Sequence, residues 1–282
     1  MKRILLALIL TIFASTGYAQ DGGLLFQVSG RSLAQPSYLY GTFHLICPGD
    51  LLLTEAMKKA LGETRQLYLE LDFDDPALQA TMMKSMLLAD GKNLKDYLKA
   101  EDYSVLDSYL QRSLGIGLAQ LGRFKPIALL SMMYVKILEC QPASYDVTLA
   151  QLAGKDGKEI LGLETVEEQM AVLERIPLEQ QLKNLVDMAR KPEDTRKEIN
   201  ELTSAYKAQD LDRIMKLMAE SNFDVDTEQE LLVKRNTNWI PIIEKAAQDK
   251  PTFFAFGAGH LGGPKGVVSL LREKGYAVTA LK

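Results

Sequence analysis

The sequence lacks the short motifs that identify the common hydrolases and nucleotide-binding proteins. It contains no G-x-S-x-G nucleophile motif, no H-E-x-x-H zinc motif and no phosphate-binding P-loop. It also lacks an excess of positive charge, because 33 Lys and Arg residues face 37 Asp and Glu residues, a net charge of −4. No basic cluster is dense enough to follow a phosphate backbone, so nucleic acid is not an expected partner.

Histidine is also scarce, with two copies in 282 residues. Both copies stand in one pattern: a hydrophobic residue, an aromatic residue, Gly, two variable residues, His and Leu. The first copy spans residues 39–45 and ends in His44 and Leu45, and the second spans 255–261 around His260. At the usual glycine frequency of about 7%, two histidines would share this Gly spacing only about 0.5% of the time. The repeat therefore indicates a shared role for the two histidines.

The one long apolar run near the start of the chain, residues 4–14, belongs to a segment with the form of a bacterial signal peptide. Lys2 and Arg3 precede the run, and small residues stand at positions 17 and 19, where a signal peptidase reads the chain. The run is too short to span a membrane. We therefore expect residues 1–19 to be removed, with export to the periplasm and no membrane anchor afterwards. An uncleaved anchor is the alternative.

Only two cysteines are present, Cys47 and Cys140. An even number of cysteines in an oxidising compartment makes a disulfide between them the first expectation. Two separate buried thiols, or a thiolate that binds a metal, are the alternatives.

Runs of strand-forming residues lie near both ends of the chain, and helical patterns fill its middle. The expected strands are residues 24–28, 37–40, 66–71, 158–163, 251–256 and 276–281. Asp72–Asp75 and Pro76 are expected to start one helix, with acids in its first turn. We predict an α/β fold in which strands from both ends of the chain build one central mixed sheet. Residues 20–282 would form a single domain with a mostly helical insertion at about 76–250.

Candidate site residues follow the expected strands. In open α/β sheets ligands bind at the carboxyl ends of strands, which is where His44, Glu70, Glu164 and His260 stand. Three glycines, Gly41, Gly257 and Gly259, would let the backbone turn sharply and approach a ligand closely.

Two histidines and a carboxylate (His44, His260 and Glu70) suit a divalent ion of Mn, Co, Zn or Fe. Such an ion would make hydroxide available near neutral pH. Without a metal, a histidine paired with Glu70 could act as a general base. A third reading is that each histidine only bonds locally at the end of its strand.

The chain resembles the TraB/GumN family, which includes the animal Tiki metalloproteases. The resemblance covers nearly all of residues 20–282 and rests on PSYLYGTFH (36–44), YLELD (68–72), Asp146 before AGK (153–155), GLETVEEQ (162–169), RNTNW (235–239) and FGAGHLGG (256–263). It implies a fold related to erythromycin esterases and haem-binding ChaN-like proteins. In the Tiki branch it also implies peptide hydrolysis that depends on Mn or Co.

The resemblance also assigns residues. The family's paired histidines fall on His44 and His260, its strand-end glutamate on Glu70, and its arginine before Asn on Arg235, next to Asn236; Asp146 and Glu164 match further family carboxylates.

Several roles stay open at this stage. Arg235 would either neutralise an oxyanion or form a salt bridge with Glu70 or Glu164 that supports the site. Asp146 and Glu164 could instead cap the helices that begin beside them. The function that these residues favour is a periplasmic metal-dependent hydrolase, with peptides as candidate substrates. The alternative is a non-catalytic periplasmic protein that binds a ligand such as haem, or that inhibits or signals.

Overall fold

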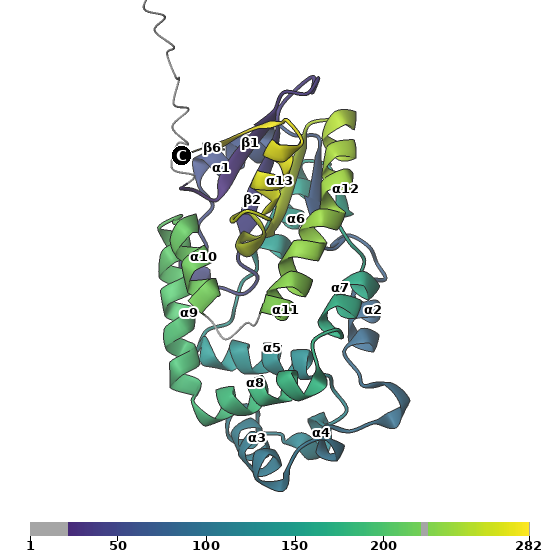
Figure 1. Ribbon diagram of the computed structural model, residues 1–282, viewed down its shortest axis with the longest axis vertical. Coiled ribbons are helices and arrows are strands. Elements are labelled where there is room, and N and C mark those ends of the chain that lie inside the picture. Colours follow the sequence, from purple (N-terminus) through teal and green to yellow (C-terminus); the bar gives the residue numbers. More distant parts are fainter. Residues whose placement is uncertain (1–21, 221–224, 282) are drawn as a thin grey trace, which may run out of the picture.

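A computed structural model describes residues 22–220 and 225–281 of the chain (Figure 1). The expected signal peptide, residues 1–19, lies outside the described residues. Within them, none of the helices has the length and apolar character needed to cross a membrane.

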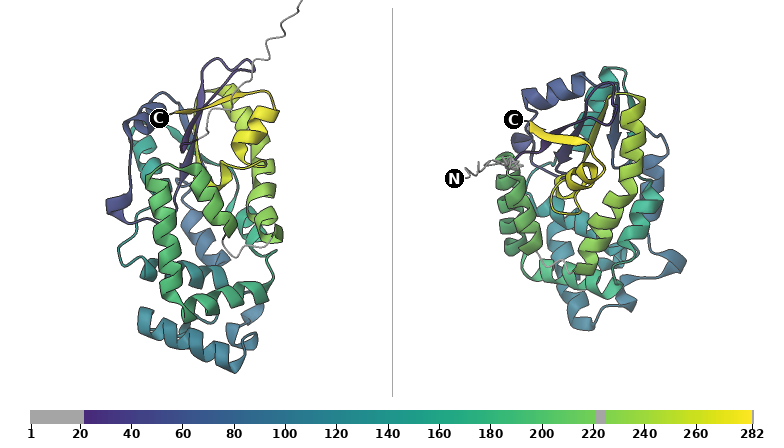
Figure 2. Two further views of the ribbon diagram at one scale, coloured as in Figure 1. Left: turned by 60° about the vertical axis from the view of Figure 1, so that its left-hand side comes forward. Right: turned by 45° about the horizontal axis from the view of Figure 1, so that its top comes forward.

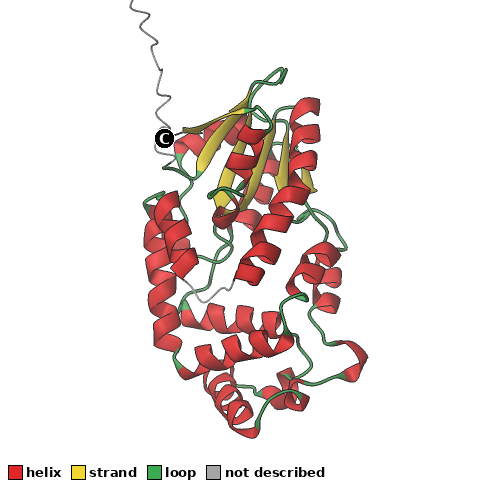
Figure 3. Cartoon of the chain, in the orientation of Figure 1, coloured by secondary structure: helices red, strands yellow, loops and turns green. Residues whose placement is uncertain are grey.

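The described residues contain a six-stranded sheet, whose strands all lie in the upper part of Figure 3. The strands are β1 (Leu25–Ser29), β2 (Ser37–Thr42), β3 (Gln66–Leu69), β4 (Glu159–Gly162), β5 (Thr252–Gly257) and β6 (Ala277–Leu281). Their order across the sheet is β4-β3-β5-β2-β1-β6. The first four strands in this order are parallel, whereas β1 pairs antiparallel with both β2 and β6. The prediction of a mixed sheet from both ends of the chain is confirmed.

Burial explains why the central strands are so apolar. In β5, Thr252 to Phe256 are all buried, and β2 is buried along its whole length. Parallel strands in the middle of a sheet are covered on both faces, so they need continuous apolar runs rather than alternation. Helices α12 (Arg235–Asp249) and α13 (Val267–Glu273) lie in front of the sheet in Figure 1, and α6 (Tyr145–Lys155) lies behind it.

The middle of the chain is helical, as predicted, and Figure 2 shows most of it at the end of the molecule away from the sheet. The other α-helices are α1 (Glu55–Gly62), α2 (Leu78–Ser85), α3 (Ala100–Leu114), α4 (Leu118–Leu121), α5 (Pro126–Ile137), α7 (Val166–Leu173), α8 (Leu178–Arg190), α9 (Pro192–Lys207), α10 (Leu211–Glu220) and α11 (Val225–Glu228). Helices α3, α5 and α8 share a hydrophobic core, built around Leu106, Leu129 and Leu185, that is separate from the core under the sheet. The assignment of residues 20–282 to one domain stays a prediction.

The helix expected to start over residues 72–76 begins instead at Leu78. The reason is local competition for backbone donors. The Asp72 side chain accepts from the N–H of Asp74 and the Asp75 side chain from the N–H of Ala77. Such bonds from a carboxylate to the backbone two residues later favour turns over helix.

The helical residues 225–249 contain an irregular turn. A π-helical segment, Gln229–Lys234, separates α11 from α12. It ends directly before Arg235, the first residue of α12. Single π-helical turns inside α-helices are frequent at functional sites.

Candidate functional site

The carboxyl ends of four adjacent parallel strands bring the expected site residues together. His44 follows β2, Glu70 follows β3, Glu164 follows β4 and His260 follows β5. Since β4, β3, β5 and β2 are neighbours in this order, their ends meet at one edge of the sheet. Two further residues reach this edge from helices. We call the set the polar cluster: His44, Glu70, Asp146, Glu164, Arg235 and His260.

Glu70 lies at the centre of the polar cluster. Its Oε1 is 3.6 Å from His44 Nε2 and 3.9 Å from His260 Nε2, and accepts the N–H of Gly257 at 2.8 Å. Its Oε2 accepts from Arg235 Nη2 at 2.5 Å. Burial raises the pKa of this carboxyl, but the charges of His44 and Arg235 outweigh burial and hold the pKa well below its usual range. Glu70 is therefore a carboxylate at any physiological pH.

His44 is the exposed member of the polar cluster. Its side chain is 59% exposed, whereas that of each other member is at most 10% exposed. Its Nδ1 lies 3.1 Å from Asp146 Oδ2, which also accepts from Ser144, while Oδ1 accepts from Thr42. The surrounding protein atoms partly desolvate the ring and so lower its pKa, but the Glu70 and Asp146 carboxylates outweigh that and raise the pKa of His44 to about 9. His44 is thus an imidazolium at neutral pH.

Asp146 does not cap α6. The N-cap of this helix is Ser144, whose side chain accepts from the N–H of Val147. The Asp146 carboxylate lies in the first helical turn and faces His44 instead.

His260 is buried and its hydrogen bonds fix one neutral tautomer. Its Nε2 lies 3.0 Å from Arg235 Nη1, and a guanidinium can only donate. Nε2 is therefore the acceptor, and Nδ1 carries the proton that it donates to Asn236 Oδ1 at 2.6 Å. Asn236 is oriented in turn by its bond to the carbonyl of Lys265. Burial lowers the pKa of His260 to about 3, because it outweighs the nearby charge of Glu70.

Arg235 uses all five of its N–H groups within the protein. Nε and Nη2 donate to Glu164, Nη2 also donates to Glu70, and Nη1 donates to the carbonyl of Leu231 and to His260. A guanidinium has five N–H donors, so none remains for a substrate oxyanion while these contacts hold. The sequence left two roles open for Arg235, neutralising an oxyanion or supporting the site through a salt bridge. The geometry favours the supporting role.

Two residues of this network were not among the site residues expected from the sequence. Gln169 donates to both Glu70 and Glu164, and Trp239 donates its indole N–H to Glu164 at 3.2 Å. Trp239 also stacks on Arg235, with 4.7 Å from the guanidinium carbon to the ring centroid. The i,i+4 spacing of Arg235 and Trp239 is the sequence signal for this contact. Glu164 is engaged by these partners, and the N-cap of α7 is Thr165.

The three glycines differ in what they face. A methyl group on Gly257 would lie 3.3 Å from both Glu70 Oε1 and His44 Nε2, so Gly257 borders the polar cluster. The same group on Gly41 would meet Ala258 and Leu261, and on Gly259 it would meet Met218. Gly41 and Gly259 therefore make room for neighbouring protein atoms in this structure.

The predicted disulfide is confirmed. Cys47 and Cys140 are bonded, with their Cα atoms 5.8 Å apart and a sequence separation of 93. The described residues contain no free cysteine.

The side chains expected to bind a metal ion are of a suitable chemical type, but they are not arranged to bind one. Asp146 and Asn236 occupy Nδ1 of the two histidines, which leaves each Nε2 as the ligand atom. However, the Nε2 of His260 is taken by Arg235. In residues 22–220 and 225–281, no group of three or more His, Cys, Asp and Glu side chains is arranged to hold a metal ion. The polar cluster as it stands does not fit a three-ligand metal centre, and nothing in it selects among Mn, Co, Zn and Fe.

Comparison with known proteins identifies relatives over most of the chain. Metalloprotease TIKI2 of Xenopus tropicalis is 27% identical over 302 residues, which cover 86% of this chain and 57% of that protein. Metalloprotease TIKI1 of Homo sapiens is 25% identical over 301 residues, covering 86% and 59%. The chain thus spans a little under three-fifths of the length of these relatives. No solved structure matches it significantly. The sequence model of the TraB/PrgY/gumN family matches residues 24–280, nearly all of the described chain, and the protein belongs to this family.

Proposed function

We propose that this protein is a hydrolase that cleaves peptide bonds at the polar cluster. The observation that carries the proposal is the exposed His44, whose Nε2 faces a carboxylate, Glu70, that the rest of the cluster fixes in place. The similarity to proteins named metalloproteases supports a protease-like reaction.

His44 is the residue that a substrate would meet first. Hydrolysis of a peptide bond needs a base for the attacking water and an acid for the leaving amine. The His44 imidazolium, held by Asp146, can donate the proton of Nε2 to the leaving nitrogen. Glu70, 3.6 Å away, can accept a proton from a water placed beside the two side chains.

The buried members of the cluster keep this pair in position. Arg235 joins Glu70 to Glu164 and to His260, and Asn236 fixes the ring of His260. Because the charged side chains in these contacts are at most 10% exposed, little solvent screens them. Their function is to orient Glu70, whose carboxylate then needs no rearrangement when substrate binds.

The relatives are named metalloproteases, so a divalent metal is the cofactor that must be tested. His44, Glu70 and His260 are the candidate ligands, and binding through all three requires Arg235 to leave His260 Nε2. We derive no step of the reaction from such an ion, because the present arrangement does not hold one.

Export to the periplasm is part of the proposal. It is supported by the signal-like sequence at residues 1–19 and by the disulfide, which persists in oxidising compartments. Cell fractionation of the untagged protein, with N-terminal sequencing of the product, tests it. Uncleaved protein in the cytoplasm would contradict it.

The decisive experiment measures cleavage of a peptide library by protein purified without a histidine tag. After dialysis against a chelator, activity is measured with no metal, with Mn²⁺ and with Co²⁺. We expect His44→Ala and Glu70→Gln to lower the rate by at least about 100-fold, the usual contribution of a general acid or base. Lys183→Ala, which removes an exposed ion pair on α8, is the matched control and should leave the rate unchanged.

Two results would overturn the proposal. One is cleavage that is unaffected by both cluster substitutions. The other is an absence of cleavage under every metal condition, together with a Soret band on haem addition that His44→Ala removes, which would replace hydrolysis with ligand binding.

A further inference from the structure

Two segments run antiparallel beside the polar cluster and are joined at three places. His44 contacts Asp146, Ile46 pairs with Ala143 through two backbone hydrogen bonds, and Cys47 is bonded to Cys140. As the first segment proceeds from residue 44 to 47, the second proceeds from 146 back to 140. The disulfide therefore closes the far end of a short ladder whose near end is the contact between His44 and Asp146.

We propose that the Cys47–Cys140 disulfide is a positioning element of the candidate catalytic centre, which holds His44 against Asp146. Its significance for catalysis rests on the proposed function, in which His44 is the acid. The geometric part of the inference, that the disulfide sets this contact, stands on the ladder alone.

The ladder is too short to hold this contact by itself. Ile46 and Ala143 form an isolated bridge with backbone N···O distances of 3.0 and 2.7 Å, and no regular strand extends it on either side. Even complete two-stranded hairpins are only marginally stable in water. More than half of the His44 side chain is exposed, so water competes for its bond to Asp146.

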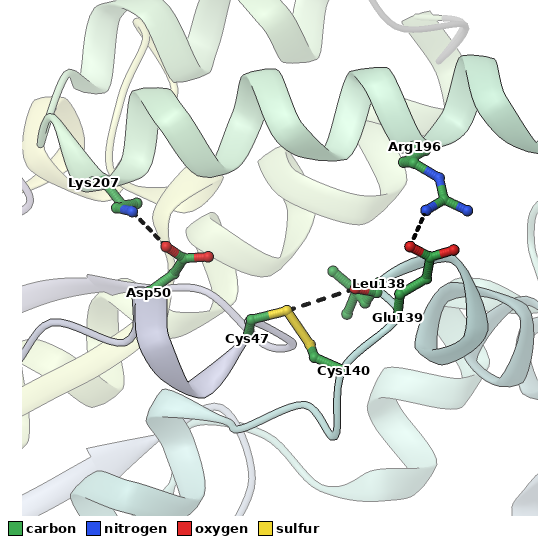
Figure 4. Close-up of a disulfide and its surroundings, with 7 residues drawn as sticks. All are labelled: Cys47, Asp50, Leu138, Glu139, Cys140, Arg196 and Lys207. Carbon is green, nitrogen blue, oxygen red and sulfur yellow. Dashed lines mark hydrogen bonds and ion pairs between the residues drawn. A yellow bond between two sulfur atoms is a disulfide. The ribbon is translucent and has the colours of Figure 1, made fainter.

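Helix α9 supports both sides of the disulfide from outside, as Figure 4 shows. Arg196 pairs with Glu139, directly before Cys140, at 2.5 Å, and Lys207 pairs with Asp50, just after Cys47. These are partly exposed ion pairs, which contribute little individually and are screened by salt. The disulfide is the one covalent link of the ladder.

Reduction would remove this link and leave the rest of the ladder in place. A small dithiol reductant transfers two electrons and two protons to the disulfide, which gives two Cys thiols and a cyclic disulfide of the reductant. Cys47 and Cys140 are both only partly buried, so a reductant can reach them. We expect reduced protein to lose the fixed contact between His44 and Asp146, while His260 keeps its contacts with Asn236 and Arg235.

Imidazole nitrogen NMR tests the inference directly. Because the chain has two histidines, a ¹⁵N-histidine sample gives two imidazole spin systems. In a Cys47→Ser/Cys140→Ser variant, the His44 nitrogen shifts should move to those of Asp146→Asn, which lacks the carboxylate. The shifts of His260, held by Asn236 and Arg235, should not move. Reduced wild-type protein should give the same spectrum as the double Ser variant. The reduced protein serves as the test sample if the variant does not fold.

Two controls separate positioning from loss of stability. The double Ser variant should not respond to the dithiol. Leu106→Ala, a large-to-small change in the separate core of α3, α5 and α8, should lower stability with the disulfide intact and leave the His44 shifts unchanged. The inference is overturned if the His44 shifts stay at their oxidised values without the disulfide, or if Leu106→Ala moves them equally.

A kinetic measurement links the inference to the reaction. Loss of the disulfide should lower kcat by at least about tenfold with a smaller change in KM, because a misplacement of about 1 Å can cost about 100-fold. A kcat equal to that of the oxidised enzyme would show that the contact has no part in catalysis. If wild-type protein cleaves no peptide at all, the proposed function fails, and the NMR result still decides whether the disulfide positions His44.

Discussion

Replacing Arg235 with Met tests whether the polar cluster is a charge-balanced buried network. Arg235 is 10% exposed and lies 2.5 Å from Glu70 and 2.6 Å from Glu164, which are 5% and 7% exposed. Removing one partner of a buried ion pair leaves an uncompensated charge and costs about 3–5 kcal/mol. Methionine has a similar length, so it limits the cavity contribution. We expect the free energy of unfolding at pH 7 to fall by about this amount.

The pH dependence of this loss identifies its cause. The pKa of Glu70 is lowered in the folded protein, so its carboxylate adds stability that is fully present above its unfolded pKa of about 4.3. That stability is lost as the pH falls below this value. Since Arg235 is one source of the lowered pKa of Glu70, its removal takes away part of this stabilisation. The difference in the free energy of unfolding between wild type and variant should be largest at pH 7 and should shrink as the pH is lowered through about 4.

Urea unfolding, followed by circular dichroism, measures both effects, with an unchanged m-value as the condition for comparing midpoints. Arg175→Met is the matched control. Arg175 also pairs with a glutamate, Glu230, at 2.8 Å, but its side chain is 54% exposed. An exposed pair contributes little to stability. The reasoning is refuted if Arg235→Met lowers stability by no more than Arg175→Met does, or if its effect is independent of pH.

Two further predictions concern the loop that carries His44. Gly41→Ala should destabilise by about 1–3 kcal/mol in urea unfolding, because its methyl would lie 2.6 Å from Leu261 Cδ1 and 3.0 Å from Ala258 Cα; a neutral effect would show that this strand end can shift freely. Peptide cleavage should fall as the pH rises through about 9, where His44 loses its proton, and Asp146→Asn should move this fall to lower pH in a pH–rate profile. An unchanged profile in the variant would exclude His44 as the acid.

Local sequence patterns were sufficient for most individual elements. The apolar run that becomes β5 predicts a buried strand because both of its faces must be covered. Thr165 with Glu168 predicts the start of α7 because the two side chains satisfy each other's backbone N–H groups. The prediction failed at Asp72–Asp75, where carboxylates that suit a first helical turn bond to the backbone in turns instead. Both structures satisfy the same donors, so composition alone does not choose between them.

The role of the charged site residues could not be read from the sequence in the same way. The expected strands placed His44, Glu70 and His260 at strand ends, and the family resemblance supplied Arg235. Whether Arg235 faces substrate or protein depends on where its five N–H groups point. Each of these groups meets a residue distant in sequence or a backbone carbonyl one turn away.

The sequence by itself determined the mixed α/β fold and the paired histidines, because these depend on local periodicity and on a repeat. The cysteine count made the disulfide the first expectation. Only the tertiary structure decided how the parts combine. The strand order β4-β3-β5-β2 sets Glu70 between two histidines from opposite ends of the chain. Burial then makes one histidine neutral, and two carboxylates make the other a cation. Charge states depend on distance and solvent access, which folding alone creates.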